Sequence, residues 1–382
     1  MKKKLAYAVA FIVSVFIMTP PWNISVTCQV NNLLWLWSVA LAGLFIFSYI
    51  YTSAPLPIKL LVLYAFVGSF FSAAPYWSFM MTIPVIISAY FYVACREIED
   101  FEIVQKMVQA AFLLICSFLI VQIAGYDTLY NFNRPQPMVI GTIGNPMISA
   151  TLITCLAPFL LTYRKLNIIP LCLIAIITNS AGMVAALAAG ITFYVIMKIK
   201  RRWLRIAAIG LIIGAVFASG APQYAAKRFK DGRGPIWKRT VELTLKRPWT
   251  GYGISAYQLV FPAMSKDLTV LGITEEWNIE NIKGTQVPAL RAHNDYLQII
   301  FEMGFIGLLL FGAFMFWLIR LFKARTDEAI TAMTGLVIIG TLMLSHFPTR
   351  LFHVIPVILC FLAFYENTMR KENGEKLYDN SR

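Results

Sequence analysis

Residues 297–319 read LQIIFEMGFIGLLLFGAFMFWLI, a run of 23 residues with one charged side chain, Glu302. An α-helix rises about 1.5 Å per residue, so this run can cross the roughly 30 Å hydrocarbon core of a bilayer. Similar apolar runs recur along the 382-residue chain, which is 59% hydrophobic and only 14% charged. A soluble domain of this size carries about a quarter charged residues. The sequence therefore predicts an all-α polytopic membrane protein.

We predict about twelve transmembrane helices, with one long, partly helical external loop between the ninth and the tenth. The first is expected to be an uncleaved span, because no small-x-small cleavage site follows it. The predicted spans are residues 5–19, 33–52, 57–74, 78–95, 107–124, 146–163, 168–179, 181–197, 203–220, 297–319, 329–346 and 351–366. The chain then divides into a transmembrane bundle at 1–220, an external catalytic loop at 221–294, and a last part at 295–382 with three spans and a tail.

The positions of the basic residues predict the orientation in the membrane. Of the 33 Lys and Arg, 20 fall in segments that share the side of the N-terminus, and the short loops on the other side hold only Arg134 and Arg350. Lys and Arg of short loops collect in the cytoplasm. We therefore expect both termini to be cytoplasmic and loop 221–294 to be external. The net charge of +14 requires no nucleic acid as a partner, because most of it faces an anionic leaflet.

Loop 221–294 is far longer than the other connections. Connections without a function seldom exceed about 12–15 residues. This loop carries 11 Lys and Arg against six acidic residues, a balance that suits a diphosphate or another anionic ligand, although most such charges are simply solvated. Within it, residues 233–245 can form a helix, which Pro248 and the sequence Gly251-Tyr252-Gly253 would end.

The sequence Arg291-Ala292-His293-Asn294 lies immediately before the tenth span. Histidine is the side chain best suited to accept a proton near neutral pH. An arginine two residues away could hold a phosphate through paired hydrogen bonds. The alternative is an interfacial histidine that only caps a helix, and spacing alone leaves both interpretations open.

Three further residues of interest lie inside the tenth span. Glu302 is a carboxylate in an apolar helix, where such a group is costly and usually faces the bundle interior or a polar cavity. Gly304 and Gly307 are three residues apart, a spacing that lets a neighbouring helix approach closely.

The sequence contains few residues or motifs that would bind a metal ion or a cofactor. The first external loop, residues 20–32, contains no Asp or Glu, the residues that hold Mg²⁺ or Mn²⁺. None of the common nucleotide-binding or zinc-protease motifs is present, and the six cysteines show no zinc-site spacing. We therefore predict no metal site and no cofactor.

Several short motifs occur in order along the chain. They are Gly141-Thr142-Ile143-Gly144-Asn145-Pro146, Asp231-Gly232-Arg233 with Trp237, Arg247-Pro248-Trp249-Thr250-Gly251-Tyr252-Gly253, and His293-Asn294 followed after nine residues by Gly304 and then by Gly307. With these motifs, and with one large external loop late in a chain of many spans, the sequence resembles the O-antigen ligase and O-antigen polymerase superfamily of bacterial envelope glycan assembly. The resemblance is strongest from Arg228 to Leu310.

The resemblance implies an enzyme of the bacterial inner membrane whose catalytic loop is periplasmic. It implies a glycosyltransferase that moves a saccharide from an undecaprenyl-diphosphate carrier to a hydroxyl acceptor such as lipid A core, without a metal and with inversion. On that interpretation His293 is the general base. The residues expected to contact the substrates are Arg233, Arg291, Asn294, Arg228 and Arg247.

One departure from the family concerns the donor. Family members often place an arginine after a serine at the outer end of a span near the middle of the chain, whereas this chain has Ser180-Ala181-Gly182. Arg134, Arg228 or Arg247 would then substitute for it.

Three alternatives to a ligase remain. Polymerases of the superfamily often show an arginine with a glycine eleven residues later, which neither Arg134 nor Arg233 provides, and this favours a ligase slightly. A transporter or flippase would predict intramembrane charges and inverted repeats, but Glu302 is nearly the only such charge and no repeat is evident. A scaffolding protein would leave the long basic loop unexplained.

Overall fold

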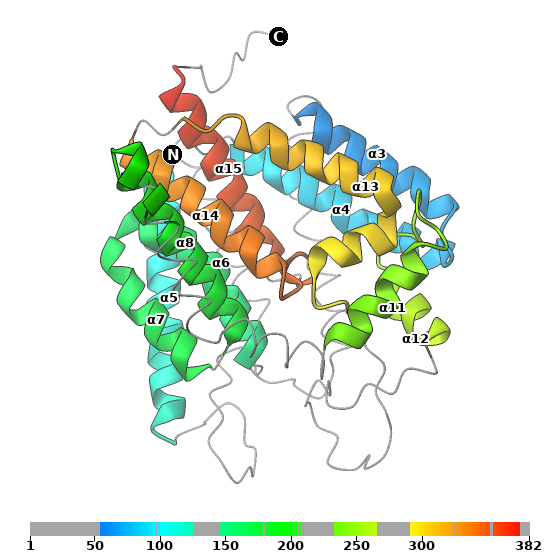
Figure 1. Ribbon diagram of the computed structural model, residues 1–382, viewed down its shortest axis with the longest axis horizontal. Helices are drawn as coiled ribbons and strands as arrows, with labels where there is room; N and C mark the ends of the chain where they lie inside the picture. Colours follow the sequence, from blue (N-terminus) through cyan, green and yellow to red (C-terminus); the bar gives the residue numbers. More distant parts are fainter. Residues whose placement is uncertain are drawn as a thin grey trace. The chain divides into compact units, whose positions relative to one another are not determined.

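A computed structural model of the chain describes residues 54–96, 98, 100–125, 146–178, 180–204, 206–207, 209, 233–265, 291–323, 326–351 and 354–374. These residues are helical and contain no strand (Figure 1). The elements in chain order are α3 (Leu56–Phe70), α4 (Pro75–Arg96), α5 (Glu102–Ile123), α6 (Pro146–Tyr163), the 3₁₀ turn η1 (Lys165–Asn167), α7 (Ile168–Ile177), α8 (Ala181–Lys198), α11 (Gly234–Thr244), α12 (Tyr257–Met264), α13 (Asp295–Ile319), α14 (Asp327–Met343), η3 (Pro348–Arg350) and α15 (Ile355–Glu372).

The chain folds into two compact units, each built from segments that are distant in sequence. The first unit consists of Met1–Ala54, Ile87–Tyr194 and Leu318–Arg382. The second consists of Pro55–Ile86 and Val195–Trp317. The first unit contains α5 to α7, most of α8, and α14 and α15, whereas the second contains α3, α11, α12 and nearly all of α13, and α4 is divided between the two.

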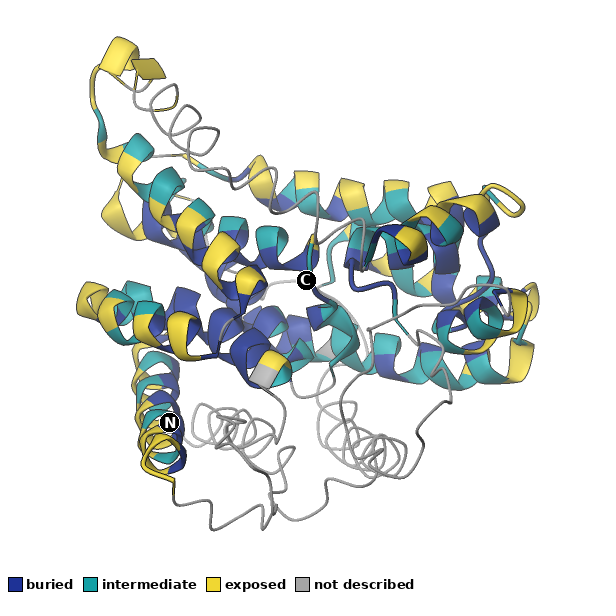
Figure 2. Ribbon diagram, turned by 60° about the horizontal axis from the view of Figure 1, so that its bottom comes forward, coloured by how far each residue is buried: buried dark blue, intermediate teal, exposed yellow. Residues whose placement is uncertain are grey.

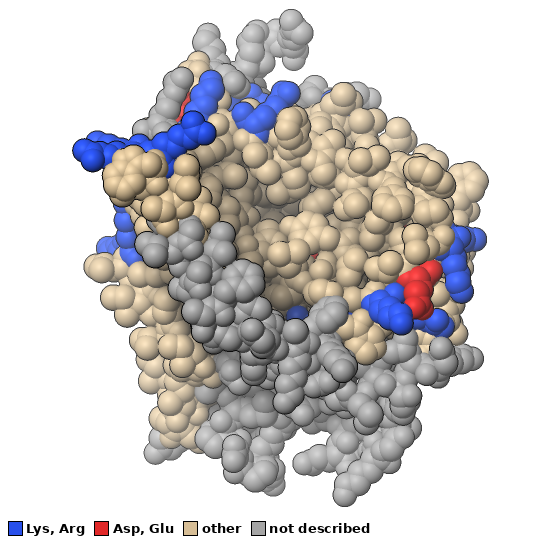
Figure 3. All heavy atoms as spheres, viewed as in Figure 1, with Lys and Arg blue, Asp and Glu red and all other residues tan. Residues whose placement is uncertain are grey.

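The helices agree with an all-α membrane protein. Four of them, α4, α5, α8 and α13, are long and apolar enough to cross a membrane, and α3, α6 and α7 provide shorter apolar helices. In Figure 3, uncharged side chains cover most of the described surface, and Lys and Arg gather in a few groups. The predicted spans at 5–19 and 33–52, and most of 203–220, lie outside the described residues, so the number of spans stays a prediction.

Helix α6 forms the core of the first unit, where it packs against α5, α7, α14 and α15. Its residues 149–160 are all buried, and Figure 2 shows such buried residues gathered on the inner sides of the helices. Small residues allow the close packing. A Cβ on Gly335 of α14 would lie 2.6 Å from Cβ of Pro158, and one on Gly190 of α8 would lie 2.4 Å from Cγ1 of Ile338. Helices in membranes associate through such small residues.

A buried ionic cluster joins the end of α4 to α15 in the first unit. The Glu366 carboxylate is fully buried and accepts a hydrogen bond of 2.6 Å from the Arg96 guanidinium, which is 6% exposed. The Tyr92 hydroxyl and Nε of Arg370 also donate to it, at 2.5 and 2.8 Å. The Asn367 amide donates to the backbone carbonyl of Arg96 at 2.9 Å. The carboxylate is therefore compensated by several donors, as a buried charge requires.

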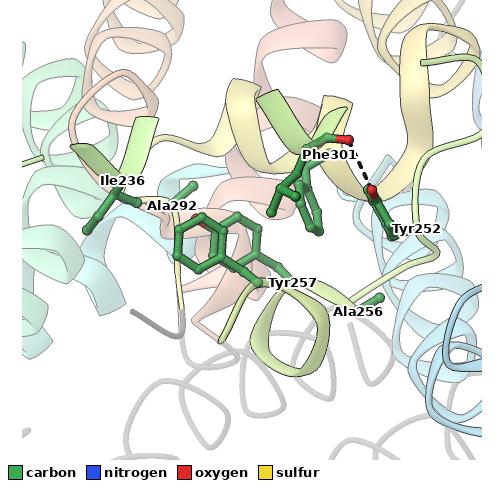
Figure 4. Packing of buried hydrophobic residues seen from close by; sticks show 8 residues of the cluster. Ile236, Tyr252, Ala256, Tyr257, Ala292 and Phe301 are labelled. Atoms are coloured by element: carbon green, nitrogen blue, oxygen red, sulfur yellow. Dashed lines mark hydrogen bonds between the residues drawn. The ribbon is translucent and has the colours of Figure 1, made fainter. Parts of the chain in front are cut away.

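An aromatic cluster forms the core of the second unit (Figure 4). Helix α11 contributes Ile236 from its inner face and has Pro235 in its first turn, where the missing N–H costs no hydrogen bond. The ring of Tyr252 stacks on Phe301 of α13 with 4.7 Å between ring centroids, and Tyr257 of α12 meets the same ring edge to face at 4.8 Å. This cluster fixes α11, α12 and the first turns of α13 against one another.

Candidate functional site

The helix that follows the Arg291-Ala292-His293-Asn294 motif is broken in its middle. α13 runs from Asp295 to Ile319, but Gly304 has φ 65° and ψ −170°, which is not helical. Glycine adopts a positive φ at little cost, whereas a Cβ would be strained there. α13 therefore consists of a first segment at 295–303 and a second at 305–319, and Figure 1 shows the bend between them.

The turn at 248–253 supplies the hydrogen bonds that the broken helix no longer makes for itself. Its amides donate to carbonyls that precede Gly304, and its carbonyls accept from amides that follow Gly304. The bonds are Tyr252 N to Phe301 O (3.0 Å), Gly253 N to Glu302 O (2.7 Å), Phe305 N to Pro248 O (2.8 Å) and Ile306 N to Trp249 O (3.3 Å). Unpaired backbone groups are costly where water is excluded, so the turn is what makes the break among these buried residues tolerable.

Glycines let the turn and the break meet backbone to backbone. A Cβ on Gly304 would lie 2.2 Å from the carbonyl oxygen of Trp249, and one on Gly251 would lie 2.5 Å from the carbonyl carbon of Glu302. The prediction that Gly304 admits a neighbouring helix is therefore wrong, because it admits a turn. At Gly307 the three atoms nearest to a Cβ all belong to the side chain of Met303 in the same helix.

The carboxylate of Glu302 holds the same junction together. It is fully buried, in agreement with the prediction that it faces the interior. Its Oε2 accepts from the backbone amide of Ser255 at 2.9 Å, and its Oε1 accepts from the side-chain amide of Gln298 at 2.9 Å. Glu302 therefore links the backbone of Ser255 to the side chain of Gln298, and these two donors compensate the cost of a carboxylate in an apolar helix.

The backbone of His293 is held in an unusual conformation. Its φ is 51°, and only Ser255 shares a positive φ among the non-glycine residues that the structure describes. The neighbouring Ala292 is pinned from two sides, because the Trp237 indole N–H donates to its carbonyl at 2.8 Å and its own amide donates to Gln298 Oε1 at 3.2 Å. Strained backbone of this kind persists only where the surroundings enforce it, and it concentrates at functional sites.

A chain of hydrogen bonds therefore connects the break in α13 with His293. Ser255 binds Glu302, Glu302 binds Gln298, and Gln298 binds the amide of Ala292, the residue before the histidine. This arrangement fixes the direction in which the imidazole leaves the backbone. We refer to Glu302, Gln298 and Trp237 below as the backbone clamp.

Two arginines act on the His293 side chain. His293 is 7% exposed, and burial lowers the pKa of its imidazole to about 3, with the positive charges of Arg233 and then Arg291 adding to the effect. Arg233 lies at the N-terminal end of α11, and Arg291 lies two residues before the histidine. Both are partly exposed. The structure thus brings the predicted base and two predicted phosphate contacts together, with the imidazole neutral at physiological pH.

Asn294 has a structural role that the sequence did not indicate. Its side-chain Oδ1 accepts from the backbone amide of Leu297 at 3.0 Å, and its own carbonyl accepts from the amide of Gln298 at 3.0 Å. This is the geometry of a helix N-cap. Asn294 therefore caps α13 with its side chain.

The structure does not bring Arg247 to this group. α11 spans 11 residues, so Arg247 lies about 16 Å along the helix from Arg233. Its guanidinium is centred 5.5 Å from the ring centroid of Tyr252. Arg228 and Arg134, the other predicted candidates for the donor, lie outside the described residues.

Gln298 is the residue that sequence reasoning missed. A signal was present, because Gln298 lies four residues after Asn294 and four before Glu302, and side chains at this spacing share one face of a helix. Trp237 was noticed as part of a motif, but its indole N–H needed the fold to find Ala292, 55 residues away.

Comparison with known protein families gives a match over part of the chain. Residues 166–312 match the family model described as O-antigen ligase, a range that includes α11, the turn at 248–253, His293 and the break in α13. No curated protein matches the chain. The match confirms the resemblance to the O-antigen ligase and polymerase superfamily, and it places the similarity to the O-antigen ligase model in residues 166–312 of the chain.

Proposed function

We propose that the protein transfers a saccharide from an undecaprenyl-diphosphate carrier to a hydroxyl acceptor, such as lipid A core, on the periplasmic face of the bacterial inner membrane. The reaction is an inverting, metal-independent glycosyl transfer of the ligase type. The observation that supports it best is the buried, neutral His293, placed beside Arg233 and Arg291 and held by the backbone clamp.

The proposed step is a single displacement. A ring nitrogen of His293 accepts the proton of the acceptor hydroxyl while the hydroxyl oxygen attacks the anomeric carbon. The bond between that carbon and the diphosphate oxygen breaks, and its electron pair remains on undecaprenyl diphosphate. Arg233 and Arg291 bind the diphosphate and stabilise the charge that develops on it. The histidine then releases its proton to solvent, and inversion follows from the single displacement.

The arginines also link donor binding to the strength of the base. Their positive charges contribute to the lowered pKa of about 3 for the His293 imidazole, so the histidine is a weak base in the free protein. A bound diphosphate brings negative charge to the same place and raises this pKa, because an opposite charge favours the imidazolium. Donor binding therefore prepares the base that activates the acceptor.

A polymerase uses the same chemistry on a different acceptor. The lack of the polymerase arginine–glycine spacing in the sequence favours the ligase. The two reactions are distinguished by their products, since a ligase attaches glycan to the acceptor whereas a polymerase lengthens glycan on its own carrier.

Complementation of a bacterial strain that lacks its own O-antigen ligase tests the proposal. We expect the wild-type chain to restore lipopolysaccharide ladders on gels, and His293→Ala to abolish them at equal abundance in the membrane. Lys238→Ala provides the control, because this residue is exposed on α11 and should leave the ladders intact. Full ladders with His293→Ala would exclude the proposed base. Extended glycan on the carrier without ligation would identify a polymerase. If neither ligated glycan nor extended carrier-linked glycan forms, the result would favour a transporter.

A further inference from the structure

A recess lies in the unit that contains His293, at the opposite end of α11 from the histidine. It has a volume of about 560 Å³, within the range typical of small-molecule sites. Its lining combines two cations, Lys246 and Arg247, with the apolar side chains of Leu259, Val260 and Met264 from α12. A recess with charge on one side and apolar walls on the other suits an amphiphile.

The cationic side is available to an anion. Lys246 and Arg247 are both exposed, and neither forms an ion pair with a carboxylate in the part of the chain that the structure describes. The two residues follow the C-terminal end of α11, where the helix carbonyls favour positive charge. Arg247 also packs against the ring of Tyr252, which orders its guanidinium. Together they can bind one phosphate group.

The apolar side is exposed as well. Leu259 is 47% exposed and Met264 36% exposed, although both are large apolar side chains. Val260 is partly buried and packs against the aromatic cluster, so the apolar side of the recess is continuous with the core of the unit. Exposed apolar side chains beside paired cations match a molecule that joins an anionic head to a hydrocarbon tail.

Hydrogen bonds connect the recess to the segment between the apolar helices α3 and α4 and to α13. The amide of Ala73, between α3 and α4, donates to the carbonyl of Tyr252 at 2.9 Å, and the amide of Tyr252 donates to Phe301 inside α13 at 3.0 Å. Tyr252 itself lines the recess. The recess therefore lies beside the segment that follows α3 and near the break in α13, a helix long and apolar enough to cross a membrane.

We propose that this recess binds an anionic phospholipid of the surrounding leaflet. Its phosphodiester lies on Lys246 and Arg247, and the start of an acyl chain lies along Leu259 and Met264. The site is separate from the reacting group, because Arg247 and Arg233 lie about 16 Å apart along α11. Tyr252 of the turn at 248–253 lines the recess and also donates to Phe301 beside the α13 break, so a bound lipid would contact this turn.

Native mass spectrometry of the full-length protein in detergent tests this site. The protein is titrated with phosphatidylglycerol and, separately, with the zwitterionic phosphatidylcholine of the same acyl chains. We expect phosphatidylglycerol to be retained at least tenfold better by the wild type. The double substitution Lys246→Gln with Arg247→Gln should lose most of this preference, and both sites are exposed, so folding should be preserved.

Two matched variants sharpen the result. Lys238→Gln removes one positive charge from an exposed site on the same helix and should keep the preference. Leu259→Gln should weaken retention of both lipids without changing their ratio. Equal retention of the two lipids by the wild type, or an unchanged preference in the Lys246 and Arg247 double variant, would overturn the proposal. A loss of preference in Lys238→Gln as large as in the double variant would show general charge attraction and would overturn it too.

Discussion

The direction of the His293 side chain depends on contacts that other residues make with the backbone. The Trp237 indole N–H and the Gln298 amide oxygen bind the two backbone groups of Ala292, the preceding residue. Neither of these residues needs to touch a substrate. Their proposed role is to hold the left-handed conformation at His293, so their removal should affect the rate more than the fold.

Trp237→Phe tests this positioning role. The phenyl ring keeps most of the packing against the aromatic cluster but cannot donate to the carbonyl of Ala292. A net hydrogen bond is worth about 1 kcal/mol, so we expect kcat for glycan transfer to fall about fivefold while the free energy of unfolding falls by no more than about 1 kcal/mol. Trp249→Phe, at a position 66% exposed, is the matched control and should leave the rate unchanged. Equal rates for wild type and Trp237→Phe would show that the Trp237 hydrogen bond does not position His293.

The buried imidazole predicts a pH dependence of stability. Burial, with Arg233 and Arg291, lowers the pKa of folded His293 to about 3, whereas the unfolded value is about 6.5. Between these values the unfolded chain binds more protons, so this contribution to stability is complete above pH 6.5 and is lost as the pH falls toward 3. Thermal unfolding in detergent should show a smaller decrease over that range for His293→Gln than for the wild type. Identical pH dependence of the two proteins would contradict the buried neutral histidine.

At the scale of elements, the break in α13 organises the site. A continuous helix would have no place for the turn at 248–253, and the clamp would lose its connection through Ser255 to Glu302. The break requires glycine, because φ at Gly304 is 65° and the backbone of Trp249 occupies the space of a Cβ.

Gly304→Ala should therefore be strongly destabilising. The left-handed backbone alone costs a Cβ-bearing residue about 1–2 kcal/mol, and overlap with the Trp249 carbonyl adds to this cost. We expect a lower melting temperature, or loss of folded protein from the membrane. Gly312→Ala in the same helix is the control, because among the described residues no atom outside the local helix backbone lies within 4 Å of its Cβ, and alanine favours a helix by up to about 1 kcal/mol. Equal stability of the two variants would contradict the conclusion that the break in α13 requires glycine at position 304.

The ionic cluster at Glu366 should stabilise the first unit. Glu366→Gln leaves the buried Arg96 without its counter-charge, and breaking a buried pair typically costs about 3–5 kcal/mol. Glu102→Gln breaks an exposed pair with Lys106 on α5 and should give no measurable change. Melting curves of the two variants in detergent provide the comparison, and equal curves would show that the cluster contributes nothing to stability.

For the whole molecule, the sequence predicted the helices better than their interruptions. Predicted span 146–163 coincides with α6, and the predicted helix at 233–245 coincides closely with α11, because apolar runs and the proline and glycines after α11 are local signals. The break at Gly304 escaped prediction, since residues 297–319 read as one apolar run and the partner of the break, Trp249, lies 55 residues earlier. The meeting of His293 with Arg233 was predicted from a family resemblance, whereas the Gln298 contact needed the fold.

The predicted orientation of the chain can be tested with introduced cysteines. Lys238→Cys on α11 should react in intact cells with a maleimide that cannot cross the inner membrane, because loop 221–294 is predicted to be periplasmic. Lys200→Cys, after α8, should react only after the membrane is opened. Both sites are exposed, so burial does not explain a difference. The opposite labelling pattern would invert the predicted topology and place His293 on the cytoplasmic side.

The most direct test of the account is an in vitro transfer assay with the purified full-length protein, a defined lipid-linked glycan donor and a lipid A core acceptor. Wild type, His293→Ala and His293→Gln are compared in excess EDTA. The account predicts product from the wild type despite the chelator, and at least about a hundredfold loss in both histidine variants, the size expected for a general base. Transfer by His293→Ala at the rate of the wild type, or complete loss of wild-type activity in EDTA, would contradict it.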